Sequence, residues 1–236
     1  MSLPEIDKNM RNIIDIVFLP GLNNPTLAVL FQTQQTWTSR LAEFKDTVGL
    51  RLITLDLVSR SYPIIASVDN LPYDSLKLMA CPSAVGGVVV ISSNSVIHVD
   101  QAGKPVGIAF NGWARRVSDF PFAPPTRDEV LEGSQCAFVS DRVFLIVYRD
   151  GSIVPVELVA DGRNIGKIEV GNKLAQTTIP SLVHLVRDDL FFVGSLVGPS
   201  VLLQLQQVEV QGSVSSGLNN PSSLEDDPMD SDDDGK

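Results

Sequence analysis

The side chains of this sequence that could do chemistry are few and lie far apart. The two histidines, His98 and His184, fall in separate strand-like runs and form no paired site. Asp56, Asp100 and Asp150 stand near strand ends, where aspartate usually forms turns, so a carboxylate pair of the glycosidase type is disfavoured. The sequence has no glycine-rich phosphate loop and no Cys/His spacing typical of a metal site. We therefore expect no catalytic residue, no cofactor and no bound metal.

Charge and composition narrow the class of protein further. The 236 residues are 44% hydrophobic and carry a formal net charge of −10. Seven acids lie within residues 225–234, so residues 1–224 hold 17 Lys and Arg against 21 Asp and Glu. Direct RNA binding, which needs clustered positive charge, is disfavoured by this balance. The two cysteines, Cys81 and Cys136, lie in apolar runs, which favours reduced thiols. With no apolar run near the roughly 18 residues of a membrane helix, we expect a soluble intracellular protein.

Short apolar runs separated by turn residues predict strands along most of the chain. Residues 88–91 are β-branched, follow Gly86-Gly87, and are separated by a polar turn from a second run at 96–99, which together predict a hairpin. The run Arg149-Asp150-Gly151-Ser152 predicts another hairpin turn. Residues 36–45 fit either a long strand or a short helix, and residues 50–58 alternate as in a half-buried strand.

These strands fall into four repeating units. The second strand of each unit recurs at spacings of 60, 56 and 47 residues, which is typical of β-propeller blades. We predict an all-β fold of about four consecutive four-stranded antiparallel blades, forming part of a larger propeller. Residues 1–12 would lead into a partial propeller at 13–211, with blades at 13–60, 74–112, 134–172 and 174–211. Residues 212–236 are predicted to be a disordered acidic linker or tail.

The long connection at residues 111–133 has no strand pattern of its own, and such connections are often functional. It carries aromatic and arginine residues of the kinds that dominate interface energetics, which makes them candidate partner-docking residues: Trp113, Arg115, Arg116, Phe120 and Phe122. The alternative is an ordinary connector whose aromatic side chains cover a blade edge.

The acidic tail holds one candidate regulatory site. Ser231 precedes three aspartates, a pattern favoured by acid-directed kinases, and phosphorylation would add charge without affecting the fold. The alternative is a spacer that keeps the chain soluble.

Several motifs, in this order and spacing, resemble the first propeller of a triple-propeller scaffold superfamily. That superfamily includes the largest subunit of the cleavage and polyadenylation specificity factor, the large subunit of the damaged-DNA-binding complex and a subunit of splicing factor 3b. The general motifs are Phe18-Leu19-Pro20-Gly21 to Pro25-Thr26-Leu27, Pro82 to Val90, and Phe192-Val193-Gly194-Ser195 to Leu203. Those that most resemble the polyadenylation member are Gln35-Thr36-Trp37, Leu71-Pro72-Tyr73-Asp74, Asn94-Ser95-Val96-Ile97 and Pro105 to Asn111.

The resemblance implies a nuclear, non-catalytic scaffold of the pre-mRNA 3′-end cleavage and polyadenylation complex. Such a scaffold organises the subunits that recognise the polyadenylation signal, including a WD-repeat protein and a CCCH zinc-finger protein. Contact with pre-mRNA would be indirect, and neither a membrane nor a small-molecule ligand is implied. The alternatives are another branch of the superfamily, a ubiquitin-ligase adaptor in DNA repair or a splicing factor 3b subunit, and more remotely a propeller enzyme.

The sequence departs from the family pattern in two respects. Leu196 stands where family members commonly carry a basic residue, and Pro199 stands where they have no proline, so a polar contact at that hairpin is not expected here. Because family members are far longer, we expect this chain to be a fragment comprising the second half of the first propeller and the start of a linker.

Overall fold

The structure is a computed structural model that describes residues 2–125 and 127–206. The chain divides into a compact unit, Met1–Leu205, and a second unit, Gln206–Lys236. The predicted acidic tail and the candidate phosphosite Ser231 therefore lie outside the described residues, as does the end of the fourth predicted blade.

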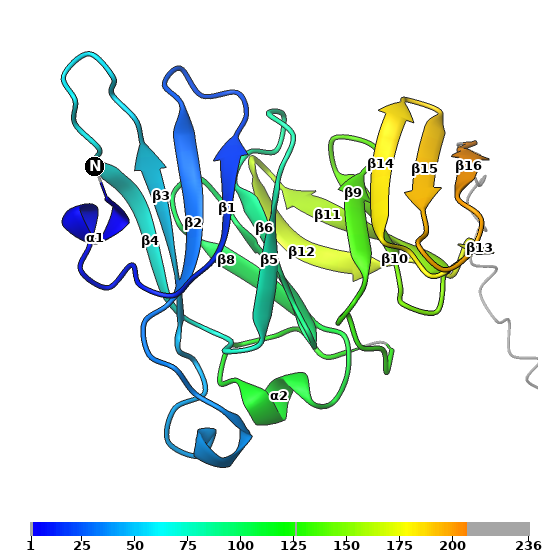
Figure 1. The fold of residues 1–236 in the computed structure, drawn as a ribbon, viewed down its shortest axis with the longest axis horizontal. Helices are drawn as coiled ribbons and strands as arrows, with labels where there is room; N and C mark the ends of the chain where they lie inside the picture. Colours follow the sequence, from blue (N-terminus) through cyan, green and yellow to red (C-terminus); the bar gives the residue numbers. More distant parts are fainter. Residues whose placement is uncertain (1, 126, 207–236) are drawn as a thin grey trace, which may run out of the picture. The chain divides into compact units, whose positions relative to one another are not determined.

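Four antiparallel sheets follow one another along the compact unit, and in each the strands pair in chain order (Figure 1). The first sheet comprises β1 (Ile13–Leu19), β2 (Thr26–Gln32), β3 (Val48–Thr54) and β4 (Ile64–Leu71). The second comprises β5 (Ser75–Ala80), β6 (Val88–Ser92), β7 (Ser95–Val99) and β8 (Pro105–Ala109). The third comprises β9 (Gln135–Phe138), β10 (Val143–Val147), β11 (Ser152–Asp161) and β12 (Asn164–Val170), with β13 (Ala175–Gln176) also on β11. The fourth comprises β14 (Leu182–Arg187), β15 (Leu190–Gly194) and β16 (Val201–Gln204).

The helical content of the described residues is small. It consists of the one-turn helices α1 (Leu3–Ile6) and α2 (Ala114–Val117) and the 3₁₀ turn η1 (Thr38–Arg40). The predicted all-β fold of consecutive antiparallel blades is therefore confirmed. The fourth sheet has three strands within the described residues, and the end of the fourth predicted blade lies outside them.

The first sheet differs from the prediction in three ways. The expected blade ended at residue 60, but β4 pairs with β3 and extends the sheet to Leu71. Residues 36–45 form no long strand, and the expected short helix is reduced to the 3₁₀ turn η1 within a loop. β3 was expected to be half-buried, yet all of its residues except Thr54 are buried, since both faces of the strand are covered.

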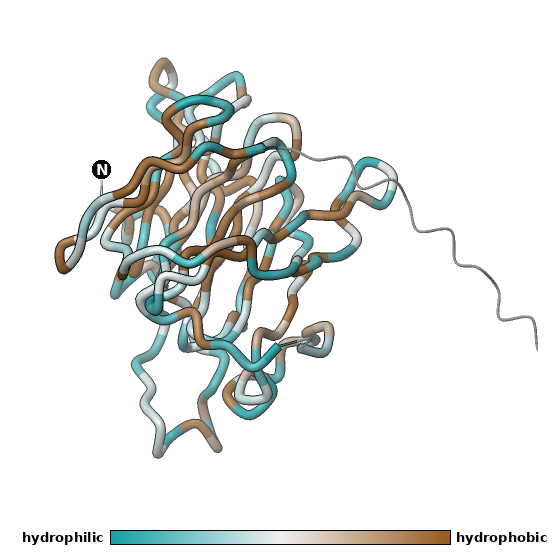
Figure 2. Tube along the Cα trace, turned by 90° about the vertical axis from the view of Figure 1, so that its right-hand side faces the viewer, coloured by the Kyte–Doolittle hydropathy of each residue, from teal (hydrophilic) through white to brown (hydrophobic). Residues whose placement is uncertain are grey.

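Three apolar clusters each join one sheet to the next. Leu30 of the first sheet and Val90 of the second share one cluster, and Val89 and Phe144 of the third sheet share another. Phe191 of the fourth sheet packs with β10 in the third cluster. Successive residues of a strand point to opposite faces, so Val89 and Val90 serve different interfaces. The central sheets are thus buried on both faces, which explains their continuous β-branched runs and the gathering of apolar residues in the strands (Figure 2).

The loop between β5 and β6 depends on a particular glycine at its end. Gly87 has a φ of +77°, and a Cβ added there would lie 2.1 Å from the carbonyl oxygen of Val99. Only glycine fits such a position, because both the backbone conformation and the close approach exclude a side chain.

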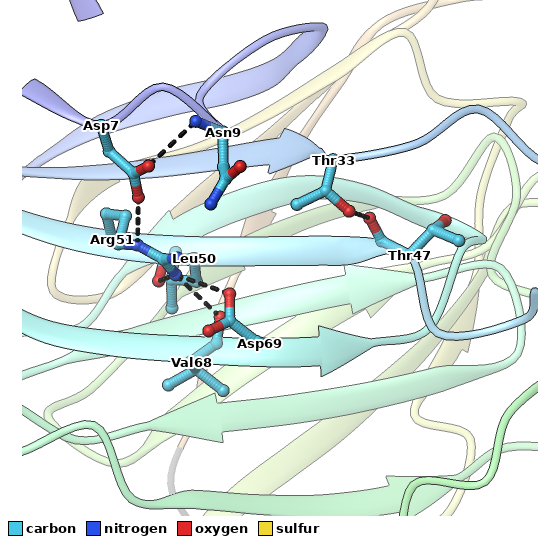
Figure 3. Close-up of polar contacts among 8 residues, drawn as sticks. All are labelled: Asp7, Asn9, Thr33, Thr47, Leu50, Arg51, Val68 and Asp69. Carbon is cyan, nitrogen blue, oxygen red and sulfur yellow. Dashed lines mark hydrogen bonds and ion pairs between the residues drawn. The ribbon is translucent and has the colours of Figure 1, made fainter. Parts of the chain in front are cut away.

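The segment before β1 covers the far face of the first sheet. Met10 is 1% exposed and joins the apolar cluster on this face. Arg51 of β3, which is 6% exposed, donates from Nε to Asp7 (2.9 Å) and from Nη1 to Asp69 (2.8 Å), as Figure 3 shows. Two backbone carbonyls accept further hydrogen bonds from the same guanidinium, so this buried charge is well satisfied. The residues expected only to lead into β1 therefore pack against the first sheet.

The far face of the fourth sheet has no such cover among the described residues. Alternate residues of β14 and β16 pack toward the third sheet, while Leu182, Val186 and Leu202 point the other way. Their side chains are 49%, 54% and 57% exposed. Together with the exposed His184 they form an uncovered and largely apolar face, which is a surface suited to packing against another sheet.

Candidate partner-docking surface

The connector between β8 and β9 is fixed by one buried amide. Asn111 is 1% exposed, and its Nδ2 donates to Oδ1 of Asn94 (2.9 Å) and to the carbonyl of Glu129 (2.7 Å). Its Oδ1 accepts from the backbone N–H groups of Trp113 (2.9 Å) and Ala114 (3.3 Å). Because these N–H groups begin α2, the amide sets the direction in which the helix and Trp113 leave the sheet.

The two phenylalanines of the predicted docking set pack against the second sheet instead of facing outward. Phe122 is 8% exposed, and its ring centroid lies 4.8 Å from that of the half-buried Phe120. A Cβ on Gly107 of β8 would lie 2.7 Å from Phe120 and 3.0 Å from Phe122, so this glycine makes room for both rings. Ala123 then donates to the carbonyl of Gly107 (3.0 Å). These two residues therefore cover the sheet, as the alternative interpretation of the connector expected.

The other three residues of the set are presented at the surface by α2. Trp113 is 56% exposed, and the guanidinium of Arg116 lies 4.7 Å from its ring centroid. Arg115 is also exposed. The guanidinium packed over the indole restricts the rotation of both side chains, which lowers the entropy lost when a partner packs on them.

A second exposed tryptophan, Trp37, lies on the loop between β2 and β3 and was not among the predicted docking residues. Trp37 is 54% exposed, and the guanidinium of Arg40 lies 5.0 Å from its ring centroid and 4.8 Å from that of Phe44. The spacing repeats that of α2, with arginine three residues after tryptophan in both Trp37/Arg40 and Trp113/Arg116. That recurrence is the sequence signal that could have identified this loop.

Polar contacts tie this loop to the connector, so that η1 and α2 lie near one another (Figure 1). Asp46 accepts from the hydroxyl of Ser118 (2.5 Å) and from the backbone N–H of Asp119 (2.9 Å). Lys45 forms an ion pair with Asp119 at 2.5 Å. The loop and the connector, far apart in the sequence, are thus linked through Lys45 and Asp46.

The residues considered for chemistry are placed apart from this surface. His98 is 1% exposed with Nε2 3.2 Å from the carbonyl oxygen of Gly86, and burial lowers its pKa. His184 lies exposed on β14. Burial raises the pKa of the Cys81 thiol to about 12, so this thiol is not a nucleophile at neutral pH. Within residues 2–125 and 127–206 no group of three or more His, Cys, Asp or Glu side chains could hold a metal ion.

None of the helices among the described residues is long and apolar enough to cross a lipid bilayer.

Comparison with known proteins identifies the family. A family model described as "RSE1/DDB1/CPSF1 first beta-propeller" matches residues 9–226. "Cleavage and polyadenylation specificity factor subunit 1" of Drosophila melanogaster is 29% identical over 208 residues, which cover 88% of this chain and 14% of that protein. The Arabidopsis thaliana protein of the same name is 30% identical over 199 residues, covering 84% of this chain and 14% of that protein. "Protein cft1" of Aspergillus fumigatus is 32% identical over 213 residues, covering 86% and 15%.

The chain therefore spans about one seventh of the length of these relatives. The resemblance identified from the motifs is confirmed over most of the sequence. The described sheets are consecutive propeller blades, and the chain belongs to the RSE1/DDB1/CPSF1 first β-propeller family.

Proposed function

We propose that this chain is part of a non-catalytic scaffold subunit of the pre-mRNA 3′-end cleavage and polyadenylation complex and acts in the nucleus. The observation that carries the proposal is the presentation of Trp113 and Arg116 on a connector that a buried amide fixes to a propeller blade. The choice of this complex rests on the relatives, which are named as cleavage and polyadenylation specificity factor subunits.

The scaffold would act through its loops. Propeller blades hold their loops on a rigid frame, and tryptophan and arginine are the residues most enriched at interface hot spots. We expect Trp113, Arg115 and Arg116 to dock another subunit of the complex, the candidates being its WD-repeat and CCCH zinc-finger subunits. Phe120 and Phe122 would serve only to hold the connector on the second sheet.

RNA would be bound by those partners and only indirectly by this chain. Residues 1–224 carry more acids than bases, and counterion release from the phosphate backbone rewards a clustered positive surface. The two other branches named in the family description remain a second candidate class, a splicing scaffold or an adaptor in DNA repair. The names of the relatives favour the polyadenylation branch.

Co-purification tests the proposal. The tagged chain, co-expressed with the WD-repeat and zinc-finger subunits of the same organism, should co-elute with at least one of them. The double variant Trp113→Ala, Arg116→Ala should weaken this association about tenfold or more, since each hot-spot truncation costs about 1 kcal/mol or more, while the thermal midpoint stays unchanged.

A matched control is the double variant Arg163→Ala, Leu196→Ala. Both residues are exposed and lie on other hairpins, so this variant should co-elute like the unaltered chain. Co-elution unaffected by the Trp113 double variant would leave the connector as a purely structural element, and failure to bind either subunit would refute the assignment to this complex.

A further inference from the structure

A groove of about 650 Å³ lies beside the tied loops. One wall is the segment 42–47, the other is formed by Asp119, Phe120 and Pro121 of the connector, and the end of β4 closes it with Asp69 and Asn70. Neither Trp113 nor Arg116 lines this groove, so an occupant would contact other residues of the loop and the connector than the proposed docking pair.

The lining combines apolar surface with negative charge. Phe44 is 37% exposed, Phe120 is half-buried and Pro121 is exposed, which provides an apolar floor. Four carboxylates line the groove, those of Glu43, Asp46, Asp69 and Asp119, against the single ammonium of Lys45.

Three of these carboxylates are already engaged. Asp46 accepts from Ser118, Asp69 from Arg51, and Asp119 pairs with Lys45. Glu43 is exposed and forms no ion pair with any other described residue. An incoming positive charge would therefore meet at least one free carboxylate and the outer oxygen atoms of the others.

From this geometry we propose that the groove docks an extended basic segment of a partner protein, in which lysine or arginine residues alternate with apolar ones. The apolar side chains would contact Phe44 and Pro121, and the cationic groups would face Glu43 and its neighbours. A volume of this size accommodates several side chains. Complementary charge would favour a basic partner and disfavour an acidic one.

Other occupants fit the groove less well. A nucleic-acid phosphate would be repelled by the excess of carboxylates. The described residues hold no cluster that could bind a metal ion. A second copy of this chain would have to supply the alternating basic segment, yet its sequence nowhere has two basic residues separated by a single residue. The inference does not depend on which complex the chain serves.

Photo-crosslinking to a synthetic peptide tests the proposal on the full chain. The probe is a peptide of alternating lysine and leucine with one photoreactive residue, and the crosslinked positions are identified by mass spectrometry. Crosslinks are expected within residues 42–47 and 119–121. Glu43→Lys should reduce them about fivefold, because it reverses the charge of the free carboxylate.

Two variants act as controls. Asp141→Lys makes a comparable change of charge at an exposed residue outside the groove and should leave the crosslinks intact. The double variant Trp113→Ala, Arg116→Ala should also retain them, which separates this site from the proposed docking surface. Crosslinks confined to the acidic residues 225–234, or an equal loss in Glu43→Lys and Asp141→Lys, would overturn the proposal, as would stronger crosslinking to a matched acidic peptide.

Discussion

Replacing Asn111 by alanine should destabilise the fold and release the segment that presents Trp113. The buried amide makes three hydrogen bonds of 2.7–2.9 Å and a fourth of 3.3 Å. A neutral hydrogen bond contributes about 1 kcal/mol, and the fourth is too long to add much, so we expect a loss of about 3 kcal/mol in the free energy of unfolding. For a domain of this size the thermal midpoint should fall by about 6–12 °C.

Urea denaturation measures this loss, and tryptophan fluorescence measures the release. In a Trp37→Phe background the emission reports on Trp113 alone, because the chain has two tryptophans. Asn111→Ala should red-shift this emission under native conditions, since α2 loses the acceptor for its first N–H groups. Asn23→Ala is the control, as Asn23 is exposed, and it should change stability by less than about 0.5 kcal/mol. A loss below about 1 kcal/mol with unchanged emission would refute the role given to Asn111.

Three further predictions concern the sheets. Gly87→Ala should lower the free energy of unfolding, measured in urea melts, by about 3 kcal/mol or more, because its Cβ would lie 2.1 Å from a carbonyl oxygen. Gly162→Ala, with a φ of +63° and open space around it, should lower it by only about 1–2 kcal/mol, and equal losses would contradict this reasoning. Burial lowers the pKa of His98 below its usual 6.5, so the unfolded state binds the proton more readily and the free energy of unfolding should fall as pH drops below about 6.5. His98→Gln should remove part of that fall, and identical stability–pH profiles of the variant and the unaltered chain would contradict this. Leu202→Lys on the uncovered face of the fourth sheet should shift the chain toward monomer in light scattering, while Val58→Lys, on a 97% exposed loop residue, should not; a chain that is already monomeric would show this face to be harmless.

The strands of the central sheets could be predicted because their sequence signals are local. The β-branched run after Gly87 has both faces buried between neighbouring sheets, so hydrophobicity alone identifies it. The strand β4 was missed because its burial alternates and Ile64 and Ile65 are both exposed. The packing of residues 3–10 on the first sheet was missed because only Met10 in that polar segment is deeply buried. The segment is held by the ion pair of Asp7 with Arg51, which lies some forty residues further along the chain.

The exposure of the candidate docking residues could not be predicted from their types, for a related reason. Residue types identified Trp113 and Phe122 equally as interface residues, but only tertiary packing decides which of two aromatic side chains turns inward. The connection of the connector to the loop at Lys45 and Asp46 links residues more than seventy positions apart, and no local pattern encodes it. The recurrence of arginine three residues after each tryptophan was present in the sequence, but nothing in the sequence showed that the segments carrying the two pairs are linked to one another.

Hydrogen–deuterium exchange, recorded for the chain alone and with the purified WD-repeat and zinc-finger subunits, tests the central claim most directly. If the connector is a docking element, the amides of residues 112–119 should exchange more slowly in the presence of the partners, and the Trp113→Ala, Arg116→Ala variant should lose that protection. The strands, already protected by their hydrogen bonds, should change little. Unchanged exchange across residues 112–119 in a mixture where the subunits demonstrably bind would contradict the claim that this surface is where the scaffold holds its partners.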